Sequence, residues 1–109
     1  MRSIVVSMQN MLLSEAVART LAETGEFRVE QVLPGKTSDT FSLCRAMQAD
    51  ILLMEVSRLP AYTLENRLKL IACVRKVMPS CKFVLLCDEN VDPESVSYTH
   101  LRAHETSLH

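Results

Sequence analysis

Few side chains in this sequence can support acid–base, metal or phosphate chemistry. The histidines, His100, His104 and His109, all lie in the last ten residues, so no imidazole is available before position 100. The two glycines, Gly25 and Gly35, lie ten positions apart, which excludes both a glycine-rich dinucleotide loop and a P-loop. The remaining candidates are carboxylates, thiols and amides at the ends of short apolar runs.

Four cysteines add thiol chemistry to these candidates. Cys44, Cys73, Cys81 and Cys87 form no Cys-x-x-Cys pair and have no histidine nearby, so no redox motif or zinc site is indicated. We expect reduced thiols in a cytoplasmic protein. Cys87 can act as a redox-sensitive residue only if its thiolate is stabilised; otherwise it is a small residue at the edge of the core.

The histidines belong to a segment that we do not expect to be native. Residues 96–106 read VSYTHLRAHET, in which His100 and His104 have the i, i+4 spacing of a helical metal site. The whole string, however, resembles one reading frame of the adapter used in transposase-based sequencing libraries. We therefore expect an incomplete domain over residues 1–95 and a non-native, adapter-derived tail over residues 96–109.

The overall composition indicates one globular domain. Apolar residues make up 48% of the 109 residues and charged residues 23%, while 12 basic and 13 acidic side chains give a net charge of −1. This balance offers no excess of positive charge for nucleic acid or for a membrane surface. No apolar run approaches the ~20 residues of a membrane helix. We expect a cytoplasmic protein that binds neither nucleic acid nor a membrane through this segment.

Short apolar runs alternate with amphipathic patterns along residues 1–95. Apolar runs bounded by turn residues predict strands, and apolar residues at i, i+3, i+4 spacing predict helices. The expected strands are Ile4–Val6, Phe27–Val32, Ile51–Met54 and Lys82–Cys87. The expected helices lie between Asn10 and Gly25, from Asp39 to Gln48 and from Leu64 to Met78, with a turn at Pro34-Gly35 and a further helix starting at Asp92-Pro93. This alternation predicts an α/β fold with a parallel sheet and helices on both faces.

The same patterns predict which side chains are buried. The apolar stripe of the first helix is expected at Leu12, Leu13, Ala16, Val17 and Leu21. Ile51–Met54 is expected to be covered on both faces of the sheet, and Lys82–Cys87 to be fully buried. The basic side chains of the third helix are expected on its solvated face, namely Arg67, Lys69, Arg75 and Lys76.

In a parallel sheet, chemistry collects at the carboxyl ends of the strands. The polar or reactive residues at those ends are Ser7, Met8 and Gln9 after the first strand, Glu55 after the third, and Cys87 and Asp88 after the fourth. These residues define the expected site.

Three segments carry a family resemblance. The segment DILLMEVSRLP (residues 50–60) resembles the third strand and following loop of response-regulator receiver domains, IVVSMQNMLLSEAVARTL resembles their first strand and helix, and KFVLLCDEN resembles their fourth strand. The resemblance implies a flavodoxin-like, receiver-type three-layer sandwich. It also implies the strand order 2-1-3-4 with the fifth strand missing, which would leave the fourth strand as an apolar edge.

The residues in the positions of the family's phosphorylation site depart from its pattern. Met8 and Gln9 stand where receivers hold Mg²⁺ with two acids, Glu55 stands where they accept a phosphoryl group on Asp, and Cys87 stands at their hydroxyl position. The proline at Pro60 falls one position late. We expect Mg²⁺ binding to be lost, no metal or other cofactor, and no phosphorylation of the usual kind. Glu55 either imitates the charge of a phosphorylated receiver or is a solvated carboxylate.

The resemblance implies a receiver-like signalling module of the two-component type, and not an enzyme. It would act by protein–protein interaction, with a sensor kinase or an effector domain as partner. One alternative is a small flavodoxin-like enzyme that binds a nucleotide or flavin. Another is a sugar-transport component phosphorylated on cysteine, which would need a cysteine at the end of the first strand, where Ser7, Met8 and Gln9 stand.

Overall fold

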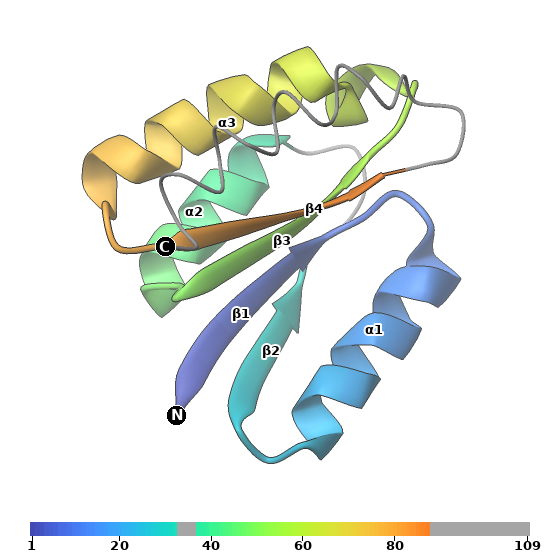
Figure 1. Cartoon of the computed structure of the whole chain (residues 1–109), viewed down its shortest axis with the longest axis vertical. Helices are drawn as coiled ribbons and strands as arrows, with labels where there is room; N and C mark the ends of the chain where they lie inside the picture. The colour runs from blue at the N-terminus through green and yellow to red at the C-terminus, as the bar shows by residue number, and fades with distance from the viewer. Residues whose placement is uncertain (33–36, 88–109) are drawn as a thin grey trace.

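The structure is a computed structural model and describes residues 1–32 and 37–87. The described elements alternate from β1 to β4 (Figure 1). They are β1 (Arg2–Ser7), α1 (Met11–Glu23), β2 (Phe27–Gln31), α2 (Thr37–Met47), β3 (Ile51–Val56), a short 3-10 helix (Pro60–Tyr62), α3 (Leu64–Val77) and β4 (Lys82–Cys87). The predicted Pro34-Gly35 turn, Asp88, the helix start at Asp92 and the tail over residues 96–109 lie outside the described residues.

The four strands form one parallel sheet in the order β2-β1-β3-β4. Ile4 of β1 aligns with Val29 of β2 on one side and with Ile51 of β3 on the other, and Leu52 of β3 aligns with Phe83 of β4. The predicted α/β fold and its strand order 2-1-3-4 are therefore confirmed. Each crossover contains a helix, as parallel pairing of neighbouring strands requires.

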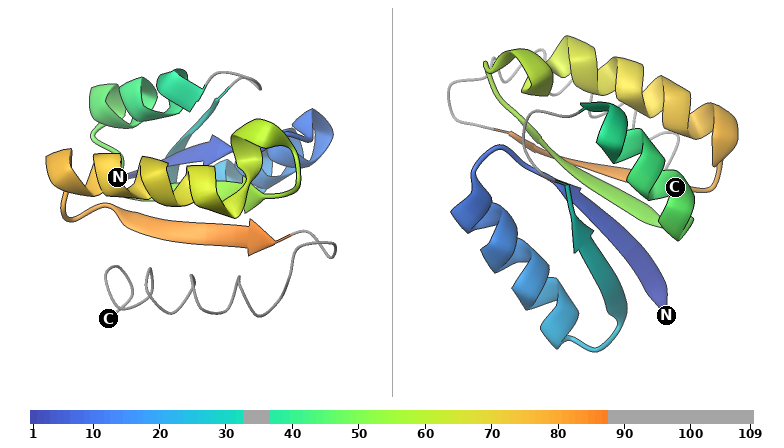
Figure 2. Two further views of the ribbon diagram at one scale, coloured as in Figure 1. Left: turned by 90° about the horizontal axis from the view of Figure 1, so that it is seen from above. Right: turned by 180° about the vertical axis from the view of Figure 1, so that it is seen from behind.

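The helices cover the two faces of the sheet unequally (Figures 1 and 2). Val5, Leu52 and Met54 point toward α2 and α3 and form the main core with the apolar side chains of those helices. Ile4 and Val6 point to the opposite face, where α1 is the one helix of the described residues that packs against them, through Val17 and Leu21. In the described part of the chain no helix is long and apolar enough to cross a membrane.

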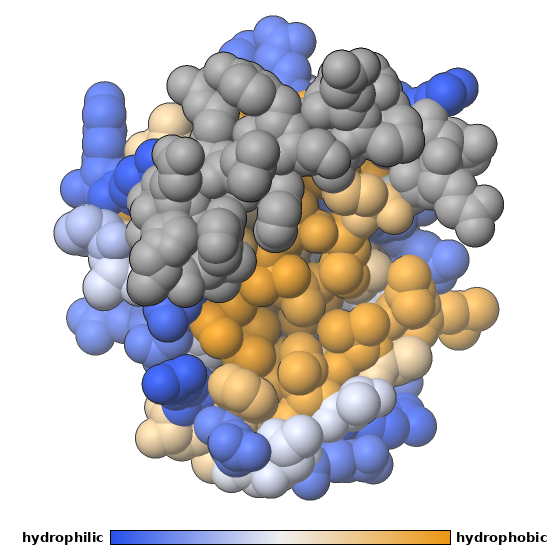
Figure 3. All heavy atoms as spheres, in the orientation of Figure 1, coloured by the Kyte–Doolittle hydropathy of each residue, from blue (hydrophilic) through white to orange (hydrophobic). Residues whose placement is uncertain are grey.

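This unequal coverage corrects two burial predictions. Along β3, Leu52 and Met54 are fully buried, but Ile51 and Leu53 on the α1 face are only half-buried. Along β4 only Phe83 is buried, so the prediction of a fully buried strand was wrong. The reason is that α1 contacts mainly β1 and β2. Figure 3 shows the resulting apolar patch over the strands beside α1.

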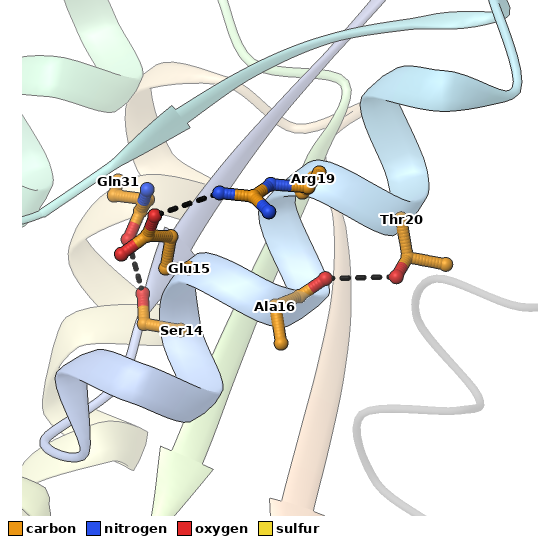
Figure 4. Close-up of polar contacts among 6 residues, drawn as sticks. All are labelled: Ser14, Glu15, Ala16, Arg19, Thr20 and Gln31. Atoms are coloured by element: carbon orange, nitrogen blue, oxygen red, sulfur yellow. Dashed lines mark hydrogen bonds and ion pairs between the residues drawn. The ribbon is translucent and has the colours of Figure 1, made fainter.

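Helix α1 packs through only part of the predicted stripe, because Val17 and Leu21 contact the core while Leu12 and Leu13 are exposed. Its buried side chains are Ser14 and Ala18, whereas Leu12 is 82% exposed. Small side chains on the inner side let the helix approach the sheet closely, and the Ser14 hydroxyl donates a hydrogen bond of 2.9 Å to Oε1 of Gln31 on β2 (Figure 4). Asn10 caps the helix as predicted, its side chain accepting from the Leu13 amide at 3.1 Å.

The chain leaves both α1 and α2 through a residue in a left-handed backbone conformation. After α1, Gly25 has a φ of 77°, the left-handed conformation that favours glycine. After α2, which starts two residues earlier than predicted, Gln48 takes the same kind of conformation with a φ of 51°. The Ala49 amide then donates back to the carbonyl of Cys44 at 3.0 Å, which turns the chain into β3.

Candidate functional site

Parallel register brings the predicted site residues to one edge of the sheet. Ser7 aligns with Met54, and Val56 aligns with Cys87, so the carboxyl ends of β1, β3 and β4 lie side by side. This edge therefore carries Met8, Gln9, Glu55 and Cys87, although only two of them are in direct contact through a hydrogen bond.

That contact joins the ends of β1 and β3. The carboxylate of Glu55 accepts a hydrogen bond from the backbone amide of Gln9, with 2.7 Å between Oε1 and the amide nitrogen. The amide belongs to the turn that leads into α1, immediately before the Asn10 cap. Glu55 is half-buried and thus holds this turn against the end of β3.

Met8 does not face the edge. Its side chain is 1% exposed and packs with Ile4 and Val6 in the apolar cluster beneath α1. Gln9 is exposed and meets Glu55 through its backbone, not through its side-chain amide. The two positions that the resemblance assigns to metal-binding acids thus provide a buried thioether and a solvated amide.

The centre of the edge is occupied by a residue predicted to be elsewhere. Arg67 of α3 is 2% exposed and is the largest fully buried side chain among the described residues. Its Nη2 donates to the carbonyl oxygen of Ser7 at 2.8 Å, its Nη1 to Oγ of Ser7 at 3.1 Å, and its Nε to the carbonyl oxygen of Glu55 at 2.8 Å. The prediction that Arg67 lies on the solvated face of its helix was wrong.

The position of Arg67 follows from helical spacing. Leu70, Ile71 and Val74 form the buried stripe of α3, and position 67 lies three, four and seven residues before them. The long side chain reaches from this stripe to the end of the sheet, where its polar head finds backbone acceptors. Extending the apolar stripe backward by one turn would have indicated this burial from the sequence.

Two further side chains complete the surroundings of the guanidinium. The Tyr62 ring, buried in the 3-10 helix after β3, lies 4.6 Å from the Arg67 guanidinium carbon, a cation–π distance. Thr40 of α2 places Oγ1 3.4 Å from Oγ of Ser7, so that the serine hydroxyl has partners on both sides. Neither Thr40 nor Tyr62 stands out in the sequence, because each is polar only at one atom and lies outside the strand ends.

The described residues at this edge do not fit Mg²⁺. A hard divalent cation needs several oxygen ligands, preferably carboxylates, and no group of three His, Cys, Asp or Glu side chains able to hold a metal forms within residues 1–32 and 37–87. The carbonyl oxygens of Ser7 and Glu55 already accept from a cationic side chain, which would also repel a divalent ion.

Cys87 ends β4 with an exposed side chain. Although it is exposed, neighbouring atoms remove part of its hydration and raise the pKa of the thiol. A raised pKa keeps the less reactive thiol form, so the structure shows no stabilisation of the thiolate that a redox-sensitive cysteine needs.

Comparison with known proteins gives matches only among solved structures. No protein-family model and no curated protein matches the sequence. A DNA-binding response regulator of the LuxR family from Staphylococcus aureus matches with a TM-score of 0.72 at 14% identity, covering 94% of this chain and 80% of that one. A response regulator from Thermotoga maritima matches with a TM-score of 0.71 at 18% identity, covering 94% and 77%.

A third match is a two-component response regulator of the LuxR family from Aurantimonas sp. SI85-9A1. It has a TM-score of 0.71 at 13% identity and covers 93% of this chain and 67% of that one. Identities this low establish shared architecture and leave activity open. The chain has the receiver-type α/β fold that these response regulators contain.

Proposed function

We propose that this chain is a receiver-type signalling module of the two-component kind that works without phosphorylation of the usual sort. In this proposal it is not an enzyme, it acts in the cytoplasm, and it takes no Mg²⁺. It signals by binding proteins, with a sensor kinase or an effector domain as the expected class of partner.

One observation carries the proposal: the edge that corresponds to a phosphorylation site is already filled and internally bonded. Glu55 is engaged by the Gln9 amide, and the buried Arg67 bonds to the backbone of the residue that would accept the phosphoryl group. Phosphoryl transfer needs a metal to neutralise charge and an accessible acceptor in line with the donor. The fold shared with response regulators supports a signalling role. The bonds made by Glu55 and Arg67 support a role that does not depend on phosphoryl transfer.

Intact-mass measurement with a phosphodonor tests the proposal. We expect the mass of the full chain to remain unchanged after incubation with acetyl phosphate and MgCl2. Glu55→Gln serves as the matched variant, because it keeps the size of the side chain while removing the nucleophilic carboxylate. A stoichiometric gain of one phosphoryl group in the wild type that disappears in Glu55→Gln would overturn the proposal.

A further inference from the structure

The most unusual feature of the molecule is a buried guanidinium with no carboxylate at ion-pair distance in the described structure. Two ion pairs of the described residues, Glu15–Arg19 and Glu65–Lys69, lie on exposed helix surfaces. Arg67 instead makes three hydrogen bonds to Ser7 and to the backbone of Glu55, all with oxygen acceptors. A charge removed from water in this way is stable only when its donors are satisfied.

The surroundings keep this group charged. Burial lowers the pKa of the Arg67 guanidinium to about 10, while Tyr62 and Glu55 act in the opposite direction, so the group is protonated at neutral pH. The aromatic face of Tyr62 and the two backbone carbonyls supply negative electrostatic potential around it.

The bonds of Arg67 connect three separate elements. The side chain comes from α3, two of its bonds reach the last residue of β1, and the third reaches β3 at Glu55. Glu55 then holds the Gln9 amide after β1. The guanidinium and the carboxylate together form a closed link between the ends of two neighbouring strands and the helix that follows the second.

We infer that Arg67 is a buried structural cation that fixes the ends of β1, β3 and α3 in one arrangement. The inference deepens the proposed function, on which it rests for the identification of this edge as the signalling site. Because the charge is covalently part of α3, this arrangement forms on folding and needs neither a metal nor a phosphoryl group. The arrangement of these ends is therefore constitutive.

Amide hydrogen exchange measured residue by residue tests this inference on the full chain. The reporters are the Gln9 amide, bonded to Glu55, and the Ser57 amide, bonded to the carbonyl of Tyr62. The reference is the Lys82 amide, which is bonded to the Asp50 carbonyl at the opposite end of the sheet. We expect Arg67→Met to speed exchange at both reporters about tenfold or more relative to the reference.

A matched variant and two milder ones control this experiment. Lys69→Met removes one positive charge from the exposed side of the same helix and should leave the ratio of reporter to reference unchanged. Arg67→Lys keeps the charge but lacks the planar fork of donors, and Ser7→Ala removes one acceptor. Both variants should raise the ratio of reporter to reference exchange rates by a smaller factor. If Arg67→Met does not fold, these two variants test the inference in its place.

The outcomes separate charge from packing. Met fills most of the same space, so unchanged exchange in Arg67→Met, or in both milder variants, would show that Arg67 only packs and would overturn the inference. Slower exchange at Gln9 and Ser57 of the wild type in millimolar MgCl2 would also overturn it, because it would reveal a metal site. Phosphorylation at Glu55 would contradict the proposed function through the intact mass, whereas the exchange ratios report on Arg67 alone.

Discussion

At the scale of single residues, the ionisable side chains buried in the main core are two thiols. Cys44 on α2 is fully buried, and Cys81 before β4 is 2% exposed, within the same core as Leu52 and Phe83. Burial, and for Cys44 also the neighbouring Cys81, raises the pKa of the Cys44 thiol to about 12. Burial and Asp50 raise the pKa of Cys81 to about 11. Both groups are neutral thiols in the folded protein.

These two thiols predict a loss of stability at alkaline pH. In the unfolded chain they release protons near their ordinary value of 9.0, whereas in the fold they retain them to about 11 and about 12. Since the folded state then binds more protons, the free energy of unfolding falls as the pH rises above about 9. Each thiol contributes a slope of up to about 1.4 kcal/mol per pH unit. Urea unfolding at a series of alkaline pH values measures this slope.

The control for this prediction is Cys44→Ala, in which one of the two titrating groups is absent and the slope should become shallower. A thiol-reactive chromophore checks the burial independently: Cys73 and Cys87 are exposed and should react in the native protein, while the other two should react only on unfolding. A slope that is the same in wild type and variant would contradict the assignment.

The sequence placed some residues of the site correctly but not Arg67. Glu55, Gln9 and Cys87 could be placed at one edge because the order of strands and helices determines which strand ends are adjacent. Arg67 could not be placed by charge alone, because a long basic side chain is usually solvated. Its burial depends on backbone acceptors at the ends of β1 and β3, which exist only once the sheet has formed.

At the scale of elements, the end of α2 is a point of backbone strain. Gln48 has a φ of 51°, a left-handed conformation in which an L side chain crowds the backbone. The hydrogen bonds from the Gln48 amide to Arg45 and from the Ala49 amide to Cys44 require this conformation to end the helix. Glycine adopts the same conformation without crowding, as Gly25 does after α1.

We therefore predict that Gln48→Gly stabilises the protein. Relief of the left-handed strain outweighs the additional backbone entropy of glycine in the unfolded chain, for a net gain of roughly 0.5–1 kcal/mol in the free energy of unfolding. Urea denaturation of wild type and variant measures the difference. Gln48→Ala retains a Cβ and should give no such gain; equal stabilisation by Ala and Gly would show that the side chain of Gln48, not the backbone, is responsible.

The positions of the strands and α-helices could be predicted from the sequence, but which side of each element is buried could not. Periodicity located every described strand and α-helix to within about two residues, because each pattern is local, but it did not predict the 3-10 helix Pro60–Tyr62. The buried side of α1 contains Ser14 and Ala18. These side chains are small enough for close packing, but they are only weakly hydrophobic, so a search for apolar periodicity does not find them. The half-burial of Leu53 depended on how many helices cover that side of the sheet, which is a property of the whole fold.

At the scale of the whole molecule, the two faces of the sheet differ in how much of them the described helices cover. Two helices cover the side of Val5 and Leu52, while α1 alone covers part of the other side. Within residues 1–32 and 37–87, β4 pairs with β3 only, and its outer edge has no strand partner in that part of the chain. Figure 3 shows an apolar patch on the face of the sheet beside α1. An apolar face joined to a long open strand edge favours association between chains.

We accordingly predict that the 109-residue chain self-associates as its concentration rises and that a charge on β4 reduces this association. Val84 is half-buried on β4, between Phe83 and Leu85 of the main core, so its side chain points to the less covered face. Val84→Lys places a charge beside the open edge and should shift the mass measured by size exclusion with light scattering toward the monomer. Val77→Lys, on the exposed side of α3, adds the same charge elsewhere and should not. A wild type that is monomeric at every concentration, or equal effects of both substitutions, would contradict association through β4.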